Sequence, residues 1–186
     1  MPSTTSNITE LLNNIPSELL TALVTAIIAV PLTLFTERRN QKNKILLNND
    51  SVTLNKLLTH YPGSFMYQYF TQQDFGLLID GDGTAKICDS VPLMNTVEYT
   101  FLNKKIEKYR LEFVKQLKLF DTLITEHFGY EEERNVFHMT YPHIIGQEKY
   151  NRLCKLVNTQ ADLVYQTYTT LITKAKSTTS FSSKEL

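Results

Sequence analysis

The hydrophobic positions of this chain fall into two different patterns. Residues 19–35 (LLTALVTAIIAVPLTLF) form one continuous run that contains no charged residue, amide or glycine. From residue 102 to residue 171, by contrast, apolar positions recur every three or four residues and are separated by polar ones. The first pattern is typical of a helix that is apolar on every side, and the second of amphipathic helices that cover a core.

The apolar run is long enough to predict a transmembrane helix over residues 19–36. A helix needs about 17–25 predominantly apolar residues to cross a bilayer. Residues 1–18 contain no Lys or Arg, whereas a cleaved signal peptide begins with a basic region. We therefore expect a short extracytoplasmic N-terminus over 1–18 and a single-pass anchor. The alternative is a buried helix in the core of a soluble domain.

A basic segment follows the apolar run and predicts its orientation. Residues 37–50 form a juxtamembrane segment whose basic residues are Arg38, Arg39, Lys42 and Lys44. Lys and Arg accumulate on the cytoplasmic side of membrane spans. We therefore expect a protein of the bacterial inner membrane with its N-terminus outside and its C-terminus in the cytoplasm.

Small side chains lie along one side of the predicted span. They are Ala22, Ala26, Ala29 and Thr33, which follow i, i+4, i+7, i+11 spacing. Helices associate in lipid through close approach of their backbones and through hydroxyl hydrogen bonds, and small residues permit both. The stripe predicts self-association of the membrane helix. The alternative is that Ala and Thr are simply common in spanning helices.

Two long amphipathic runs predict a mainly α domain over residues 51–176. The first run comprises Leu102, Ile106, Tyr109, Phe113, Leu117, Phe120, Ile124 and Phe128, and the second comprises Tyr150, Leu153, Val157, Ala161, Val164, Tyr168 and Leu171. Each run implies a helix of about 25–30 residues. Joined by a loop over 129–146, the two helices should pair as an antiparallel hairpin. The polar residues 177–186 predict a disordered tail.

Two shorter segments leave their structure open. Residues 65–70 (FMYQYF) fit a helix or a strand, because periodicity does not separate the two over so short a run. Asp80-Gly81-Asp82-Gly83 separates two short apolar runs and has the composition of a turn. A small β-hairpin is therefore expected near residues 75–88.

The composition gives little indication of nucleic-acid binding, disulfides or a metal site. Lys plus Arg (19) equals Asp plus Glu (19), so net charge favours neither nucleic acid nor an acidic partner. Cys88 and Cys154 are too few for a disulfide framework or a four-cysteine zinc site. The spacing of His138 and His143 matches no common zinc pattern. We expect no metal ion and no cofactor.

One predicted helix carries an excess of basic residues. Between residues 99 and 118 these are Lys104, Lys105, Lys108, Arg110, Lys115 and Lys118, against two acids. Such a face suits anionic lipid or nucleic acid. The alternative is an ordinary solvated face, so direct contact with nucleic acid is not supported by this feature alone.

The segment Leu77-Leu78-Ile79-Asp80-Gly81-Asp82-Gly83-Thr84 resembles the first motif of haloacid-dehalogenase-type phosphatases. The resemblance implies that Asp80 is a nucleophile and Asp82 a general acid/base, with a magnesium ion between them. That family has a parallel sheet and later lysine and acidic motifs, and no counterpart of these follows Cys88. We therefore expect the aspartates and glycines of this segment to serve backbone geometry.

A second resemblance rests on four short segments. They are Gln73-Asp74-Phe75-Gly76, Tyr99-Thr100-Phe101-Leu102-Asn103, Leu156-Val157-Asn158 and Tyr165-Gln166-Thr167-Tyr168. In layout the chain resembles a loose group of small bacterial membrane proteins that have an N-terminal span and a helical cytosolic domain. Some similar proteins are effectors of antiphage systems, including retron-associated ones. The resemblance implies a membrane effector and supplies no catalytic residues.

The leading hypothesis for function is therefore a non-enzymatic inner-membrane effector that disrupts the membrane on release from a partner. Its expected partners are membrane lipid, a second copy through the membrane helix, and a cytosolic protein or ribonucleoprotein. The first alternative is a passive tether that recruits a cytosolic complex to the membrane. The second alternative is a membrane-bound phosphatase that uses Asp80 and Asp82.

Overall fold

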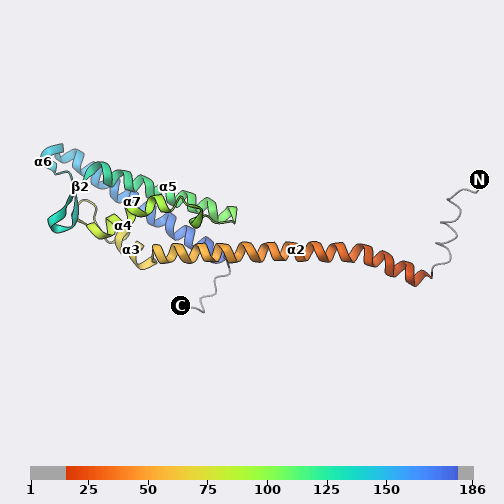
Figure 1. Cartoon of the computed structure of the whole chain (residues 1–186). Coiled ribbons are helices and arrows are strands. Elements are labelled where there is room, and N and C mark those ends of the chain that lie inside the picture. The colour runs from red at the N-terminus through yellow and green to blue at the C-terminus, as the bar shows by residue number, and fades with distance from the viewer. Residues whose placement is uncertain (1–15, 180–186) are drawn as a thin grey trace, which may run out of the picture. The chain divides into compact units, whose positions relative to one another are not determined.

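The computed structural model describes residues 16–179, which form two compact units (Figure 1). The first unit comprises Met1–Ile45 and the second Leu46–Leu186. The described residues are mainly helical with one small antiparallel sheet, as the sequence predicts. The expected extracytoplasmic segment 1–18 and tail 177–186 lie largely outside the described residues.

A single 44-residue helix, α2 (Ser17–His60), supplies the described part of the first unit and begins the second. The predicted juxtamembrane segment 37–50 and the first residues of the predicted domain, 51–60, are thus parts of one helix. The helix continues through Pro31 and ends at His60, two residues before Pro62. Among residues 16–179, no helix combines the length and the apolar character that a membrane crossing requires. The crossing predicted over residues 19–36 stays a prediction.

The remaining helices belong to the second unit. They are α3 (Gly63–Thr71), α4 (Gly81–Leu93), η1 (Val97–Tyr99), α5 (Lys104–His127), η2 (Glu132–Arg134), α6 (Pro142–Ile145) and α7 (Gln147–Thr179). The helix alternative for residues 65–70 is therefore correct, because they lie in α3. Figure 1 shows α5 and α7 side by side and running in opposite directions.

The predicted helical hairpin is confirmed by the pairing of α5 with α7. The ring of Phe113 lies 5.8 Å from that of Tyr168, and the Gln160 amide donates to the Gln116 carbonyl oxygen at 2.9 Å. Apolar stripes face each other across the pair, comprising Ile106, Phe113, Val114, Leu117, Phe120 and Ile124 of α5 and Val157, Ala161, Val164, Tyr168 and Leu171 of α7. The three-to-four spacing in the sequence is the cause of this packing.

The sheet contains β1 (Ile79–Asp80), β2 (Phe128–Glu131) and β3 (Val136–Met139) in the order β1-β3-β2. Tyr130 pairs with Phe137 in the β2–β3 hairpin, and Ile79 pairs with Phe137 from the other side. The hairpin expected near residues 75–88 is therefore wrong, since helix α4 begins at Gly81. The actual hairpin, β2–β3, lies in the segment 129–146 that is predicted above as a loop.

Helix α5 leads directly into strand β2. The C-cap is Phe128, and Gly129 pairs with His138 in the sheet. The chain turns instead at Asn135, whose φ of 50° lies in the left-handed region that Asn tolerates better than most residues.

An aromatic cluster forms the centre of the second unit. The ring of Phe120 from α5 lies 5.1 Å from those of Phe70 and Phe75, in edge-on geometry. Tyr69 adds a third edge-on contact to the same ring at 6.3 Å. Phe70, Phe75 and Phe120 are almost completely buried. Aromatic pairs in this geometry add to the hydrophobic stabilisation of the core.

A buried polar network holds the loop before α5. Asp50 is 2 % exposed and accepts the N–H groups of Leu102 and Asn103 at 2.6 and 3.1 Å. Glu107 accepts from Arg110 Nε at 2.8 Å, and Arg110 donates to the carbonyl oxygen of Met94. These bonds join α2, residues 94–103 and the start of α5. They give the buried charges of Asp50 and Arg110 hydrogen-bond partners, which offsets the cost of their burial.

Candidate functional site

The Asp80–Thr84 segment forms the start of α4. Asp80 is the N-cap, and its Oδ2 accepts the N–H of Gly83 at 2.7 Å. The Thr84 hydroxyl donates to the Asp80 carbonyl oxygen at 2.6 Å. Aspartate is among the best N-cap residues, because its carboxylate satisfies a free N–H of the first turn. The sequence pattern that indicated a turn is thus a helix start.

The second aspartate and the first glycine hold the β2–β3 hairpin against this helix. Asp82 Oδ1 accepts from the Asn135 side-chain amide at 3.0 Å, and the Gly81 N–H donates to the Asn135 carbonyl oxygen at 2.9 Å. A Cβ at Gly81 would lie 2.5 Å from that carbonyl oxygen. Glycine is therefore required here for close approach of two backbones.

These contacts support the structural role expected for the motif. Both aspartates accept hydrogen bonds from protein N–H groups that position α4 and the hairpin. The sheet beside them is antiparallel and its strands are two to four residues long. The parallel sheet of the phosphatase family has no counterpart within residues 16–179.

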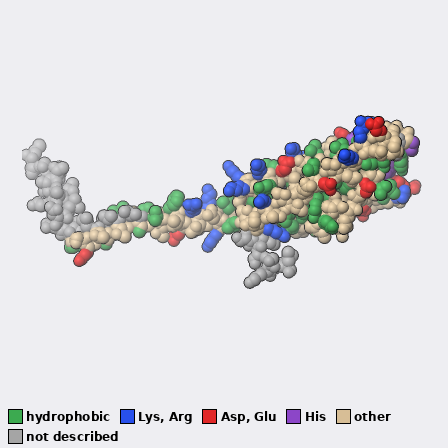
Figure 2. Space-filling model, turned by 180° about the vertical axis from the view of Figure 1, so that it is seen from behind, with side chains coloured by type: hydrophobic (Ala, Val, Ile, Leu, Met, Phe, Trp, Pro, Cys, Tyr) green, Lys and Arg blue, Asp and Glu red, His purple; other side chains and the backbone are tan. Residues whose placement is uncertain are grey.

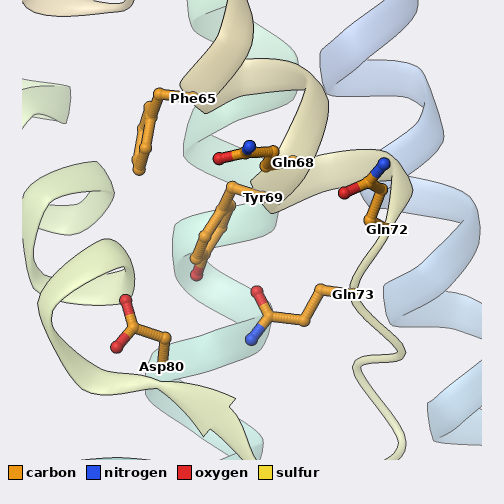
Figure 3. Close-up of a pocket in the computed structure, with 6 residues that line it drawn as sticks. All are labelled: Phe65, Gln68, Tyr69, Gln72, Gln73 and Asp80. Atoms are coloured by element: carbon orange, nitrogen blue, oxygen red, sulfur yellow. The ribbon is translucent and has the colours of Figure 1, made fainter.

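Asp80 also lines an open pocket between α3 and the start of α4 (Figure 3). The pocket has a volume of about 340 Å³, and its other lining residues are Phe65, Gln68, Tyr69, Gln72 and Gln73. In Figure 3 the ring of Tyr69 and the side chain of Gln73 point into the same space, whereas the Asp80 carboxylate is directed toward the first turn of α4. The helical spacing of Phe65, Gln68 and Tyr69 places these three residues on one side of α3, and Gln72, the C-cap, follows on that side.

The chemistry of this pocket suits recognition. Three carboxamides both donate and accept hydrogen bonds, and one carboxylate accepts them. Lys86 Nζ lies 4.3 Å from the centre of the Phe65 ring, a cation–π contact. Burial raises the pKa of Tyr69, and its hydroxyl bonds to Thr84 Oγ1 at 2.7 Å, so it stays protonated at neutral pH. The pocket therefore offers directional hydrogen bonds beside aromatic walls.

His138 and His143 lie on either side of Tyr141. Their rings are 4.9 and 5.6 Å from the Tyr141 ring and nearly parallel to it. In the part of the chain that the structure describes, no three His, Cys, Asp or Glu side chains are placed to hold a metal ion. The observed role of these histidines is stacking.

The two cysteines are free and only partly exposed. Burial, and next a hydrogen bond with Asp121, raise the pKa of Cys88 to about 12. Burial is also the main cause that raises the pKa of Cys154, which lies beside Met139. Because the thiolate is the reactive form, both thiols are poor nucleophiles at neutral pH.

The predicted residues of the membrane segment all lie on α2, and their side chains are exposed. These are Ala22, Ala26, Ala29 and Thr33 of the small-residue stripe and Arg38, Arg39, Lys42 and Lys44 of the basic segment. The Thr33 hydroxyl donates to the carbonyl oxygen of Ala29 at 2.6 Å. The Thr33 hydroxyl therefore has its hydrogen-bond partner within its own helix. Self-association through the stripe stays a prediction.

Two of the segments that carried the second resemblance meet in the structure. Asn158 of α7 accepts the N–H of Phe75 at 3.0 Å and donates to Asp74 at the same distance. Asp74 also accepts the Gly76 N–H, and these two hydrogen bonds lower its pKa. Comparison with protein-family models, curated proteins and solved structures finds no match.

Two residues that organise the second unit around these sites carry no signal in the sequence. Asp50 and Asn135 bond to segments about 50 residues away along the chain, so no local pattern marks them. A signal did exist for Asp80, because an aspartate followed by apolar positions at Ile87 and Val91 is typical of a helix start.

Proposed function

We propose that this protein is a non-enzymatic effector of the bacterial inner membrane. Residues 19–36 insert into the bilayer with the N-terminus outside, and the unit that begins at Leu46 lies in the cytoplasm. Release from a cytosolic protein or ribonucleoprotein partner lets the inserted helices cluster and disrupt the membrane. The resemblance described above implies antiphage defence as the setting.

Exposed apolar side chains on α2 are the observation that carries this proposal. Six large ones within residues 19–35 are at least half exposed, namely Leu19, Ile27, Val30, Leu32, Leu34 and Phe35. Each Å² of such surface gains about 25 cal/mol when it leaves water. Contiguous exposed apolar surface marks a site of association with a membrane or another protein. The absence of any charge in this run favours lipid.

The helical unit contributes recognition to the proposed function. The pocket of Figure 3 presents carboxamides, a carboxylate and aromatic rings between α3 and the start of α4. Such a mixture binds the polar groups of a protein or nucleotide partner with orientation. The aspartates of the phosphatase-like motif have structural bonds, which favours the non-enzymatic hypothesis.

Localisation and membrane potential together test the proposal. The full chain, expressed without its native neighbours, should remain in the membrane fraction after alkaline carbonate extraction. Its induction should depolarise the cells, as measured with a potential-sensitive dye. Membrane retention with an unchanged potential would favour the passive tether. Recovery in the soluble fraction would contradict both hypotheses, and magnesium-dependent phosphate release that Asp80→Asn abolishes would favour the phosphatase.

The small-residue stripe provides a test of the clustering step. Ala26→Leu adds bulk at the centre of the stripe and keeps the segment apolar, so it should abolish depolarisation without lowering the amount in the membrane. Ile27→Phe adds bulk at least about 100° around the helix from each residue of the stripe and serves as the control. Equal depolarisation by both variants, with cross-linking that shows only monomers, would refute clustering through this stripe.

A further inference from the structure

One end of the helical unit gathers lysines from distant parts of the chain. Phe113 of α5 contacts Tyr168 of α7. Lys105 lies eight residues before Phe113, toward the start of α5. Lys176 lies eight residues after Tyr168, toward the end of α7. At about 1.5 Å per residue, both steps cover about 12 Å in the same direction, because the two helices are antiparallel. The start of α5 and the end of α7 are therefore neighbours.

Five exposed lysines belong to this end, which we call the lysine end: Lys104, Lys105, Lys108, Lys174 and Lys176. Among residues 16–179 none of the five has a carboxylate within 4 Å. The acids nearby are already engaged, since Glu107 pairs with Arg110, Glu98 pairs with Lys56, and Asp50 is buried. Counting only residues 16–179, the lysine end therefore carries an excess of positive charge.

The opposite end of the unit is different. The β2–β3 hairpin carries Glu131, Glu132 and Glu133 against Arg134. In Figure 2, Lys and Arg side chains gather toward one end of the helical unit, whereas the other end mixes acidic, basic and histidine side chains. A chain with no net charge is thus polarised along its helical unit.

Packing fixes the lysine end beside the entry of the chain into the unit. Asp50, four residues after Leu46 at the unit boundary, binds the N–H groups of Leu102 and Asn103 directly before Lys104. The basic residues Arg38, Arg39, Lys42 and Lys44 precede this boundary in the sequence. The lysines are therefore held next to the point where the chain arrives from the segment proposed to enter the bilayer.

We propose that the lysine end binds the anionic phospholipid headgroups of the inner leaflet. This inference rests on the proposed membrane insertion and adds its second contact. Lysine is a flexible cation suited to diffuse headgroup charge, and basic clusters beside a membrane segment bind anionic lipid. The consequence is a helical unit that lies on the bilayer in one orientation, with the hairpin end directed away from the anionic surface.

Lysine labelling in vesicles tests this orientation with the full chain. The protein is reconstituted in vesicles of phosphatidylcholine alone or with 30 % phosphatidylglycerol, as about a third of anionic lipid sets a strong surface potential. Brief acetylation followed by mass spectrometry then reports the reactivity of each lysine. In the anionic vesicles, the lysine end should react at least about threefold more slowly. Lys149 and Lys155, which are exposed on α7 toward the hairpin, should be unchanged.

A charge-reversal pair separates the lysine end from charge in general. Lys104→Glu/Lys105→Glu/Lys108→Glu should abolish the protection of Lys174 and Lys176. Lys118→Glu/Lys149→Glu/Lys155→Glu makes the same change in net charge and should leave that protection intact. Circular dichroism checks that both variants keep their helical content.

The outcomes distinguish this inference from the proposed function. Protein that fails to float with phosphatidylcholine vesicles would contradict the membrane insertion. Protein that floats, but whose lysine end reacts equally in both vesicles, would overturn only the lipid contact. Protection of the lysine end by single-stranded RNA and not by anionic lipid would also overturn it, and would assign the surface to nucleic acid.

Discussion

Helix α2 and helix α5 show two different ways in which a helix satisfies its apolar residues. Helix α5 buries one stripe, with Phe113, Leu117 and Phe120 at 0 % exposure, and leaves Leu119 on its other side 47 % exposed. The first unit's part of α2 leaves Phe35 67 % exposed and no large side chain is described there as buried. Both segments are helical, so helicity alone does not reveal what surrounds them.

The difference follows from how polar residues are distributed. In α5, lysines and glutamates occupy the positions between the apolar ones, so one side can face water while the other faces α7. Residues 19–35 contain no such positions. A helix of this composition has no charged side, which is consistent with the proposed insertion into apolar surroundings. The comparison predicts opposite responses to the same kinds of mutation.

The largest expected effect is the loss of a core ring from α5. Phe120→Ala removes the side chain at the centre of the aromatic cluster and should lower the free energy of unfolding by about 3–5 kcal/mol. Leu119→Ala, its neighbour on the exposed side, should change it by less than about 0.5 kcal/mol. Urea denaturation followed by circular dichroism measures both. Similar losses in the two variants would mean that α5 does not bury the stripe described above.

A charge in the apolar run should have the second-largest effect, and on a different property. Ile27→Lys should release the protein from the membrane fraction, because a lysine at the centre of a spanning helix costs about 2.5–3.5 kcal/mol. The thermal midpoint of the helical unit should stay unchanged. Leu119→Lys is the control, since it also places a charge on an exposed apolar position and should leave membrane retention intact. Retention of both variants would contradict insertion of residues 19–36.

The sequence was most informative where one local rule decides the structure. The stripes of α5 and α7 were predictable because their periodicity extends over about 20 residues, and Pro62 marked the end of α2. The helix start at Asp80 was mistaken for a turn because aspartate and glycine favour both. Its surroundings were decided by Asn135, a residue more than 50 positions away.

The candidate site shows the same limit more strongly. Asp80 was recognised as chemically notable, but its neighbours Gln68 and Gln72 carry no motif. They line the pocket only because α3 packs beside the start of α4. The lysine end likewise joins residues 104–108 to 174–176 through the register of α5 against α7, which the two periodic patterns do not specify. The pocket and the lysine end are both assembled by tertiary packing, which no local sequence pattern specifies.

A third prediction concerns space inside the packed unit. A Cβ at Gly83 would lie 2.9 Å from the ring of Tyr69, so Gly83→Ala should cost about 1–3 kcal/mol through overpacking. At Gly63 the nearest atom would be 3.9 Å away, and Gly63→Ala should be nearly neutral. Neither glycine has a positive φ. Thermal unfolding compares the two variants, and equal costs would mean that the space at Gly83 does not limit the side chain.

The smallest expected effect is a pH dependence confined to the packed end of α2. Burial of His60, and next the charge of Lys86, lower its pKa from the ordinary value of 6.5. The His60 ring packs edge-on against the Tyr61 ring at 4.9 Å and against the Tyr99 ring at 6.1 Å. A lowered pKa means that the unfolded chain binds a proton more readily than the folded one. The stabilising contribution is therefore complete above pH 6.5 and is lost as the pH falls below it.

This contribution sharpens the contrast between the two parts of α2. Lowering the pH from 7.5 to about 5.5 should reduce the thermal midpoint of the helical unit by less than about 3 °C. His60→Gln should remove most of that decrease, because glutamine does not titrate. Membrane retention should stay constant over the same range, since residues 19–35 contain no titratable group. A decrease of equal size in His60→Gln would assign the pH dependence to other groups and leave His60 without this role.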